Sequence, residues 1–146
     1  MRALVVCLGN ICRSPIGEGL LKHHAALTGL PLTVDSAGTS GWHQGDLPDE
    51  RSIAVMKHHG HDIRDQRSRA LTQEDLYLFD FILVMDEQNE QDVMALGHGT
   101  ARVARFVPGQ DVPDPYFGGT NGFETVYTMV DQAAQNWIKE WHTTKL

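Results

Sequence analysis

Residues 3–15 read ALVVCLGNICRSP and establish how the fold begins. The apolar run Ala3–Val6 contains β-branched residues, which predicts a buried strand that ends at Cys7. After a short loop, Ser14 and Pro15 are residue types that begin helices, with Ser14 as the N-cap and Pro15 in the first helical position. The stretch therefore predicts a strand, a tight loop and a helix.

The rest of the chain continues this alternation. Further strands are predicted at residues 32–36, 81–85 and 103–107. Helices are predicted at residues 15–29, 48–59, 73–78, 86–96 and 123–141, with loops at 38–45 and 109–122. Such alternation is typical of an α/β domain on a parallel sheet, where ligands bind beyond the carboxyl ends of the strands. Cys7 lies at such an end.

The composition is that of a globular protein. The chain has 146 residues, 41% of them apolar, so we expect a single domain over residues 1–146. A net charge of −7 disfavours binding to nucleic acid or anionic membranes. No apolar stretch is long enough for membrane insertion, and the first residues are too few for a signal-peptide core. The two cysteines are too few to stabilise a secreted fold, which favours a reducing cytoplasm.

The loop Cys7–Ser14 has the features of an anion-binding site. A loop between a strand end and a helix N-terminus turns backbone N–H groups inward, and the helix dipole adds about half a positive charge. Gly9 and Asn10 tolerate the positive φ angle that a tight ring requires. Arg13 supplies a planar guanidinium that matches two phosphate oxygens. The other loop residues expected to surround a bound phosphate are Leu8, Gly9, Asn10, Ile11 and Cys12.

Cys7 is the candidate nucleophile of this loop. The positive environment should lower the pKa of Cys7 below the free value of about 8.5. A thiolate beneath a bound phosphate is positioned for phosphoryl transfer, and the Ser14 hydroxyl can donate a hydrogen bond to it. The alternative is a buried structural cysteine with a capping serine. The spacing of cysteine, five residues, arginine and serine at a strand end favours the catalytic interpretation.

The chain resembles the low-molecular-weight protein tyrosine phosphatases, bacterial members in particular, over nearly its whole length. Besides the loop, segments in family order carry the resemblance: DSAGT at 35–39 with Trp42, MDEQN at 85–89, DPYFGG at 114–119 and GFE at 122–124. The resemblance implies a flavodoxin-like α/β domain of three layers with a four-stranded parallel sheet. It also implies that no cofactor is needed and that the reaction passes through a phosphocysteine intermediate.

By this resemblance Cys7 is the nucleophile, Arg13 the phosphate clamp, Ser14 the thiolate stabiliser and Asp114 the general acid. Asp114 stands between two prolines, which restrict the backbone and hold the side chain in place. A carboxylic acid there can protonate the departing oxygen and later take a proton from the attacking water. Taken alone, the segment also fits a solvated turn, and Asp111 is the second candidate for the acid.

Aromatic and polar residues complete the predicted site. Trp42 and Tyr116 lie in loop segments and are expected to form walls for an aryl phosphate, whereas Phe117 either forms a wall or packs under its loop. Asn10 is expected to hold the loop by side-chain hydrogen bonds, and Ser36 resembles a family partner for it.

Two further positions carry open questions. Cys12 either captures an oxidised Cys7 as a disulfide or fills apolar space. Gln66 stands where many family members have a histidine that supports the loop, and a glutamine cannot titrate. Eight histidines invite a metal hypothesis, but both cysteines belong to the loop, so we expect no metal site.

The sequence thus predicts a cytoplasmic phosphatase that hydrolyses phosphotyrosine in proteins, or small aryl phosphates, and releases inorganic phosphate. Arsenate reductases of the same fold need further cysteines, and this chain has none beyond Cys12. Phosphoarginine phosphatases of the same fold tend to carry threonine where Ile11 stands. A non-catalytic phosphate- or flavin-binding module would need the loop, but not Cys7, Arg13 and Asp114 together.

Overall fold

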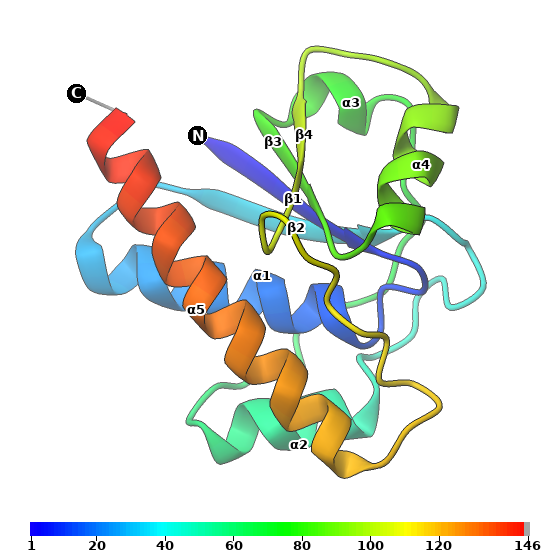
Figure 1. The fold of residues 1–146 in the computed structure, drawn as a ribbon, viewed down its shortest axis with the longest axis vertical. Coiled ribbons are helices and arrows are strands. Elements are labelled where there is room, and N and C mark those ends of the chain that lie inside the picture. Colours follow the sequence, from blue (N-terminus) through cyan, green and yellow to red (C-terminus); the bar gives the residue numbers. More distant parts are fainter. Residues whose placement is uncertain (145–146) are drawn as a thin grey trace.

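A computed structural model describes residues 1–144 of the chain (Figure 1). Four parallel strands form one sheet in the order β2-β1-β3-β4. They are β1 (Arg2–Cys7), β2 (Thr33–Gly38), β3 (Phe81–Val84) and β4 (Arg102–Arg105). This is the order of the first four strands of flavodoxin-like sheets. The predicted α/β class and four-stranded parallel sheet are therefore confirmed.

Five helices connect or follow the strands. They are α1 (Arg13–Thr28), α2 (Glu50–His58), α3 (Asp75–Leu78), α4 (Glu87–Leu96) and α5 (Thr120–Thr144). All five were predicted, with boundaries that shift by a few residues. Among residues 1–144, none of these helices has the length and apolar character needed to cross a membrane.

The prediction for the start of α1 was wrong in its detail. The N-cap is Cys12, which makes no side-chain cap hydrogen bond, and the helix begins at Arg13. Ser14 therefore lies within the first turn. Its hydroxyl does not cap the helix because it contacts the Cys7 sulfur at 3.1 Å and the Asn10 amide at 2.7 Å. Polar contacts inside the loop have replaced the cap that local sequence favoured.

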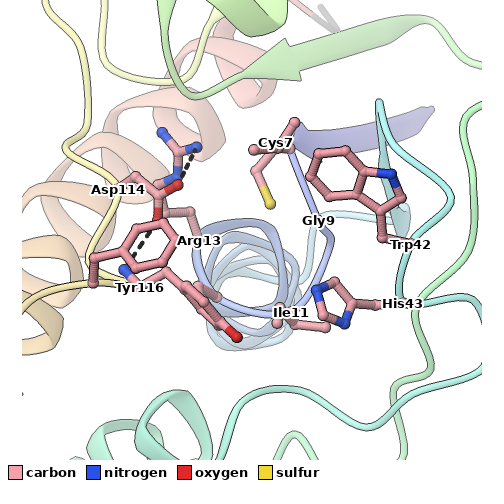
Figure 2. Close-up of a pocket in the computed structure, with 11 residues that line it drawn as sticks. Cys7, Gly9, Ile11, Arg13, Trp42, His43, Asp114 and Tyr116 are labelled. Carbon is pink, nitrogen blue, oxygen red and sulfur yellow. Dashed lines mark hydrogen bonds and ion pairs between the residues drawn. The ribbon is translucent and has the colours of Figure 1, made fainter.

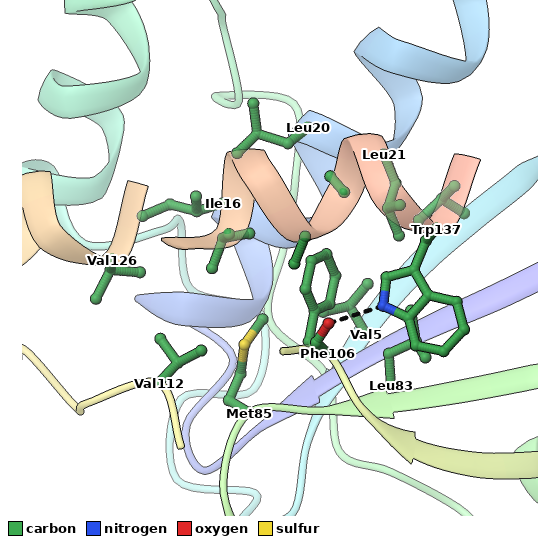
Figure 3. Packing of buried hydrophobic residues seen from close by; sticks show 14 of the residues in the cluster. Val5, Ile16, Leu20, Leu21, Leu83, Met85, Phe106, Val112, Val126 and Trp137 are labelled. Carbon is green, nitrogen blue, oxygen red and sulfur yellow. Dashed lines mark hydrogen bonds between the residues drawn. The ribbon is translucent and has the colours of Figure 1, made fainter. Parts of the chain in front are cut away.

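Two apolar cores cover the two faces of the sheet, which gives the three predicted layers (Figure 1). Successive residues of β1 alternate between them: Ala3 and Val5 face α1 and α5, whereas Leu4 and Val6 face α3 and α4. Figure 3 shows the larger core. Burial of each large side chain among them, such as Leu4 or Val5, contributes about 1.5–3 kcal/mol, so the two cores stabilise the packing of the helices on the sheet.

Two glycines let backbone and helix approach the sheet closely. A Cβ atom on Gly17 would lie 2.9 Å from the Val5 side chain, so its absence lets α1 pack directly on β1. A Cβ on Gly38 would lie 2.9 Å from the carbonyl oxygen of Leu8. The end of β2 therefore supports the loop that follows β1, at the carboxyl edge of the sheet.

Candidate active site

A cavity of about 360 Å³ opens where the loop after β1 meets the carboxyl edge of the sheet (Figure 2). Its lining residues come from the β1–α1 loop, from the segment after β2 and from the loop before α5. They are Cys7, Leu8, Gly9, Ile11, Cys12, Arg13, Trp42, His43, Asp114, Tyr116 and Phe117. The structure thus brings together three segments that lie far apart in the sequence, at the position expected for a ligand in a parallel α/β sheet.

Cys7 lies at the floor of this cavity and is 2% exposed. The backbone N–H of Asn10 points at its sulfur, with the nitrogen at 3.3 Å, and the Ser14 hydroxyl oxygen lies 3.1 Å away. Asn10 adopts a φ of 57°, the left-handed conformation predicted for this position. That conformation turns the loop around the sulfur.

The side chain of Asn10 is oriented by an unambiguous partner. Its Oδ1 accepts from the backbone N–H of Arg69 at 3.0 Å, and a backbone N–H can only donate. The amide nitrogen Nδ2 must therefore face the other way, where it donates to Ser36 Oγ at 2.9 Å and Ser14 Oγ at 2.7 Å. Asn10 and Ser14 are both buried, and neither is among the residues that line the cavity.

A buried carboxylate completes this chain of hydrogen bonds. Ser36 Oγ lies 2.6 Å from Glu18 Oε1, so Ser36 donates to Glu18 and accepts from Asn10. Lys22 pairs with Glu18 at 2.5 Å. Because Ser14 Oγ already accepts from Asn10, its own hydrogen is free to point at Cys7. Asn10 therefore donates to Ser14, and Ser14 in turn donates to the Cys7 sulfur.

Sequence analysis missed the contribution of Glu18. A buried glutamate is rare unless it is paired, and an i,i+4 Glu–Lys pair on the sheet-facing side of α1 was the available signal. Gln66 does not join the chain of hydrogen bonds in place of the family's histidine. Its amide donates to the carbonyl oxygen of Pro15 at 3.0 Å, at the start of α1.

Arg13 is 2% exposed and lines the cavity from the first turn of α1. Its guanidinium donates to Asp86 Oδ2 at 2.7 Å and to the Val112 carbonyl oxygen at 2.9 Å. Burial disfavours the charged form, but Cys7, Asp86 and Asp114 outweigh it, so the pKa of Arg13 is raised above its usual value. Arg13 therefore carries a permanent positive charge beside the sulfur.

Asp86 anchors this arginine and also begins a helix. Its Oδ1 accepts from the backbone N–H of Asn89 at 2.8 Å, which caps α4, while Oδ2 accepts from Arg13. The sequence predicted only that a helix begins at residue 86. The contact with Arg13 joins residues 73 positions apart, and no local pattern predicts it.

Asp114 lies on the cavity wall, whereas Asp111 does not. One carboxylate oxygen of Asp114 accepts from the backbone N–H of Tyr116 at 3.0 Å, and the other lies 3.7 Å from Arg13. Asp111 instead pairs with Arg105 at 2.8 Å and accepts from the backbone N–H of Glu87. The position of Asp114 is thus consistent with the predicted acid, and Asp111 is held elsewhere.

Aromatic side chains form the rim. Trp42 stands on one side of Cys7, and Tyr116 stands on the other side with Asp114 (Figure 2). Phe117, which the sequence left open, also lines the cavity, is 94% exposed and packs edge-on against Tyr116 at 4.9 Å. His43 lines the cavity beside Trp42 and was not singled out from the sequence.

Cys12 is buried and stays protonated. Burial, reinforced by the negative charge of Asp49, raises the pKa of the Cys12 thiol to about 12. Cys7 and Cys12 are both free cysteines in the structure. At neutral pH Cys12 is therefore a neutral thiol within the loop, and a disulfide between the two stays one of the two alternatives left open by the sequence.

One group of side chains within residues 1–144 has ligand types and spacing suited to a metal ion. It consists of His58, His59 and Glu124, all exposed, with one ligand atom from each within 4.8 Å of the others. None of them lines the cavity, and His59 is stacked on Tyr127 at 3.8 Å. The site around Cys7 contains no comparable set of ligands among the described residues.

Comparison with known proteins agrees with this site. Residues 2–145 match the family model described as low molecular weight phosphotyrosine protein phosphatase. A family member from Schizosaccharomyces pombe is 34% identical over 150 residues, which cover 95% of this chain and 96% of the relative. The crystal structure of a protein tyrosine phosphatase from Entamoeba histolytica superposes with a TM-score of 0.93 at 34% identity, covering 100% of this chain and 99% of that one.

A Drosophila arginine phosphatase has the same fold. Its structure superposes with a TM-score of 0.87 at 31% identity, covering 97% of this chain and 98% of that one. The fold therefore occurs with more than one named substrate. The match of the family model to nearly every residue, together with the relatives' names, shows that this chain belongs to the low molecular weight phosphotyrosine protein phosphatase family.

Proposed function

We propose that this enzyme hydrolyses phosphotyrosine in proteins through a phosphocysteine intermediate on Cys7. The observation that carries the proposal is the position of the Cys7 sulfur. It lies at the cavity floor within reach of the Asn10 N–H and the Ser14 hydroxyl, beside a permanently charged Arg13. These groups stabilise a thiolate and also match the charge of a bound phosphate dianion.

In the first step the Cys7 thiolate attacks phosphorus, and the bond from phosphorus to the tyrosine oxygen breaks. Arg13 and the backbone N–H groups of the loop stabilise the negative charge on the three equatorial oxygens. Asp114 gives its proton to the departing phenolate oxygen, so that tyrosine leaves as a neutral phenol. The phosphoryl group is then bonded to sulfur.

In the second step water attacks phosphorus in line with the sulfur. The carboxylate of Asp114 takes a proton from that water, the sulfur–phosphorus bond breaks, and inorganic phosphate leaves. Cys7 departs as a thiolate, which the Ser14 hydrogen bond stabilises. The Asn10–Ser36–Glu18 chain supports this by keeping the Ser14 hydrogen directed at sulfur.

The shape of the cavity supports an aryl substrate. The exposed aromatic rings of Trp42, Tyr116 and Phe117 stand above Cys7, so a phosphate attached to a planar ring reaches the sulfur while the ring lies between them. A phosphoserine side chain is shorter and offers no ring to these walls. Phosphoprotein substrates follow from the family, and we propose that proteins in the cytoplasm supply them.

Three alternatives are less well supported. Ile11, an apolar side chain, lines the cavity where phosphoarginine phosphatases tend to carry threonine. Arsenate reduction needs a relay of thiols, and the second cysteine, Cys12, has a pKa of about 12 that disfavours its thiolate. A non-catalytic phosphate-binding module would not need Asp114 beside the guanidinium.

The test is hydrolysis of three phosphopeptides that carry phosphotyrosine, phosphoserine or phosphoarginine in one sequence. We expect the phosphotyrosine peptide to have the highest kcat/KM by at least about 100-fold, because only its ring contacts the aromatic walls. The Cys7→Ser variant, purified in parallel, should be inactive towards all three. Faster hydrolysis of the phosphoarginine peptide would favour the second activity of this fold, and an active Cys7→Ser variant would exclude the proposed mechanism.

A further inference from the structure

Arg51, in the first turn of α2, is held rigidly by a neighbouring carboxylate. Its guanidinium forms a bidentate ion pair with Asp49, with Nε 3.0 Å from Oδ1 and Nη2 3.0 Å from Oδ2. Asp49 is also the N-cap of α2 and accepts from the backbone N–H of Arg51 at 2.8 Å. The direction of the guanidinium is therefore set by the helix start.

The free edge of this guanidinium reaches the loop that carries Asp114. Arg51 Nη2 donates to the carbonyl oxygen of Tyr116 at 3.0 Å, and Nη1 donates to that of Gly118 at 3.3 Å. The guanidinium also lies 4.6 Å from the centre of the Phe123 ring and 5.6 Å from that of Tyr116. Of the hydrogen bonds described in residues 1–144, these two are the ones that join residues 115–118 to another element.

The same helix start also holds the phosphate-binding loop. The backbone N–H of Asp49 donates to the carbonyl oxygen of Ile11 at 2.7 Å, and Ser52 Oγ donates to that of Cys12 at 3.1 Å. One turn of backbone therefore fixes the loop around Cys7, while Arg51 fixes the loop of Asp114. The start of α2 therefore contacts both loops, in addition to the direct contacts of Arg13 with Val112 and Asp114.

We infer that Arg51 is a positioning residue for proton transfer by Asp114: it fixes the loop of the acid relative to the loop of the nucleophile. The inference rests on the proposed role of Asp114 as the general acid. Arg51 is not among the residues that line the cavity, so we expect it to act without contacting the substrate. Its loss should let the loop move and place the carboxyl less often against the leaving oxygen, which is costly because proton transfer requires hydrogen-bond reach.

The chain contains a matched control for this pair. Asp62 and Arg64 repeat the local geometry, with Nε 3.0 Å from Oδ1, Nη2 2.9 Å from Oδ2 and the Arg64 backbone N–H donating to Oδ1 at 3.0 Å. Their side chains are exposed to 62% and 71%, and the described hydrogen bonds of this pair do not reach the Asp114 loop. Arg64→Ala therefore removes an equivalent ion pair without the contact that matters here.

The experiment compares kcat/KM for phenyl phosphate, which has a poor leaving group, and p-nitrophenyl phosphate, which has a good one. Arg51→Ala should lower the first by about 10-fold and the second by no more than about 2-fold, because a good leaving group needs less protonation. For Arg51→Lys, the fall in kcat/KM for phenyl phosphate should lie between that of Arg51→Ala and none, since an ammonium reaches one carbonyl oxygen but not both. Arg64→Ala should leave both values unchanged. The ratio of the two rates does not depend on how much of a variant is folded.

Asp114→Ala, measured alongside, separates the failure of this inference from that of the proposed function. If Asp114→Ala shows no dependence on the leaving group, the assignment of the acid is wrong, and the role of Arg51 with it. A second outcome is that the rate of Asp114→Ala depends on the leaving group but Arg51→Ala slows both substrates equally or leaves both rates unchanged. In that case only the inference about Arg51 is overturned. In the Asp114→Ala background, Arg51→Ala should add no further dependence on the leaving group.

Discussion

The hydroxyl of Ser36 donates to the buried carboxylate of Glu18 across 2.6 Å, and this contact sets the direction of the hydrogen bond between Ser36 and Asn10. A carboxylate only accepts, so Ser36 accepts from Asn10. The backbone N–H of Arg69 fixes the other side of the Asn10 amide, so that both contacts favour the same amide orientation. In that orientation Asn10 donates to Ser14, whose own hydrogen is free to point at Cys7.

Weakening the contact between Ser36 and Glu18 should slow the enzyme. Glu18→Gln removes the charged acceptor of Ser36, so Asn10 and Ser14 should be held less firmly, and we expect kcat to fall by about 3- to 10-fold. Ser14→Ala removes the hydroxyl that donates to Cys7, so its kcat should fall by about 10- to 100-fold. This fall is the largest effect expected from these hydrogen bonds. Lys22→Gln is the comparison variant: it removes the half-exposed ion-pair partner of Glu18 but keeps the carboxylate that accepts from Ser36, so its effect on kcat should be smaller. Equal activities of wild type and Ser14→Ala would show that the chain has no role at the sulfur.

The aromatic rim should contribute to binding more than to chemistry. Trp42→Ala and Phe117→Ala should each raise KM for an aryl phosphate by about 3- to 10-fold, with kcat within about 2-fold of wild type. Both side chains are exposed and line the cavity, so we expect them to contact a substrate ring equally before and during the reaction. Tyr77→Ala, an exposed aromatic residue outside the cavity, should change neither value. A fall in kcat with KM unchanged would place these rings in the chemical step.

Cys12 should resist alkylation at pH values where ordinary thiols react. Its pKa of about 12 leaves almost no thiolate near neutral pH, and the reaction rate should rise about tenfold per pH unit until that pKa is approached. Mass spectrometry of the iodoacetamide-treated enzyme at about pH 7 should therefore find the label on Cys7. Inorganic phosphate should protect Cys7, and the Cys7→Ser variant should stay unlabelled. Rapid labelling of Cys12 in that variant would contradict its burial.

Asp75 should stabilise the fold only above acidic pH. Burial alone would raise the pKa of this carboxyl, but Arg69, at 2.9 and 3.1 Å, and the backbone N–H of Thr72 outweigh it and hold the pKa below its usual value of 3.8. The unfolded chain therefore binds the proton more readily than the folded protein. The stabilisation is fully present above the unfolded pKa and is lost as the pH falls through the lower, folded value.

The test of this sign is urea unfolding of Asp75→Asn and wild type at several pH values. The variant should be less stable by about 2 kcal/mol near pH 7. That difference should shrink steadily below about pH 4, as wild type loses its advantage. A difference that stays constant down to about pH 3 would mean that the ionised carboxylate contributes nothing.

Sequence patterns predicted the fold well because each strand and helix carries its own periodicity. The apolar run at Ala3–Val6 and the glycine after α1 needed no tertiary information. The start of α1 was misjudged because Ser14 has a partner, Cys7, that competes with the backbone for its hydroxyl. A helix cap that local propensity predicts does not form when the same side chain makes a more favourable tertiary hydrogen bond.

The supporting residues of the site were harder to predict for the same reason. Arg13 and Asp86 are 73 residues apart, and Arg51 and Tyr116 are 65 apart. The neighbouring positions of β1 and β3 bring the first pair together, and the packing of α2 against α5 brings the second pair together, so the local sequence signals neither contact. The loop around Cys7 was recognisable because its chemistry is contained in eight consecutive residues, 7–14.

Transfer of the phosphoryl group to the sulfur of Cys7 can be tested by trapping the phosphoenzyme intermediate. The enzyme would be mixed with p-nitrophenyl phosphate, quenched rapidly in acid and digested, and the peptide that bears the phosphoryl group would be sequenced by mass spectrometry. We predict a phosphoryl group on Cys7, with none on the Cys7→Ser protein. A phosphoryl group on another residue, or steady turnover by Cys7→Ser, would contradict the account.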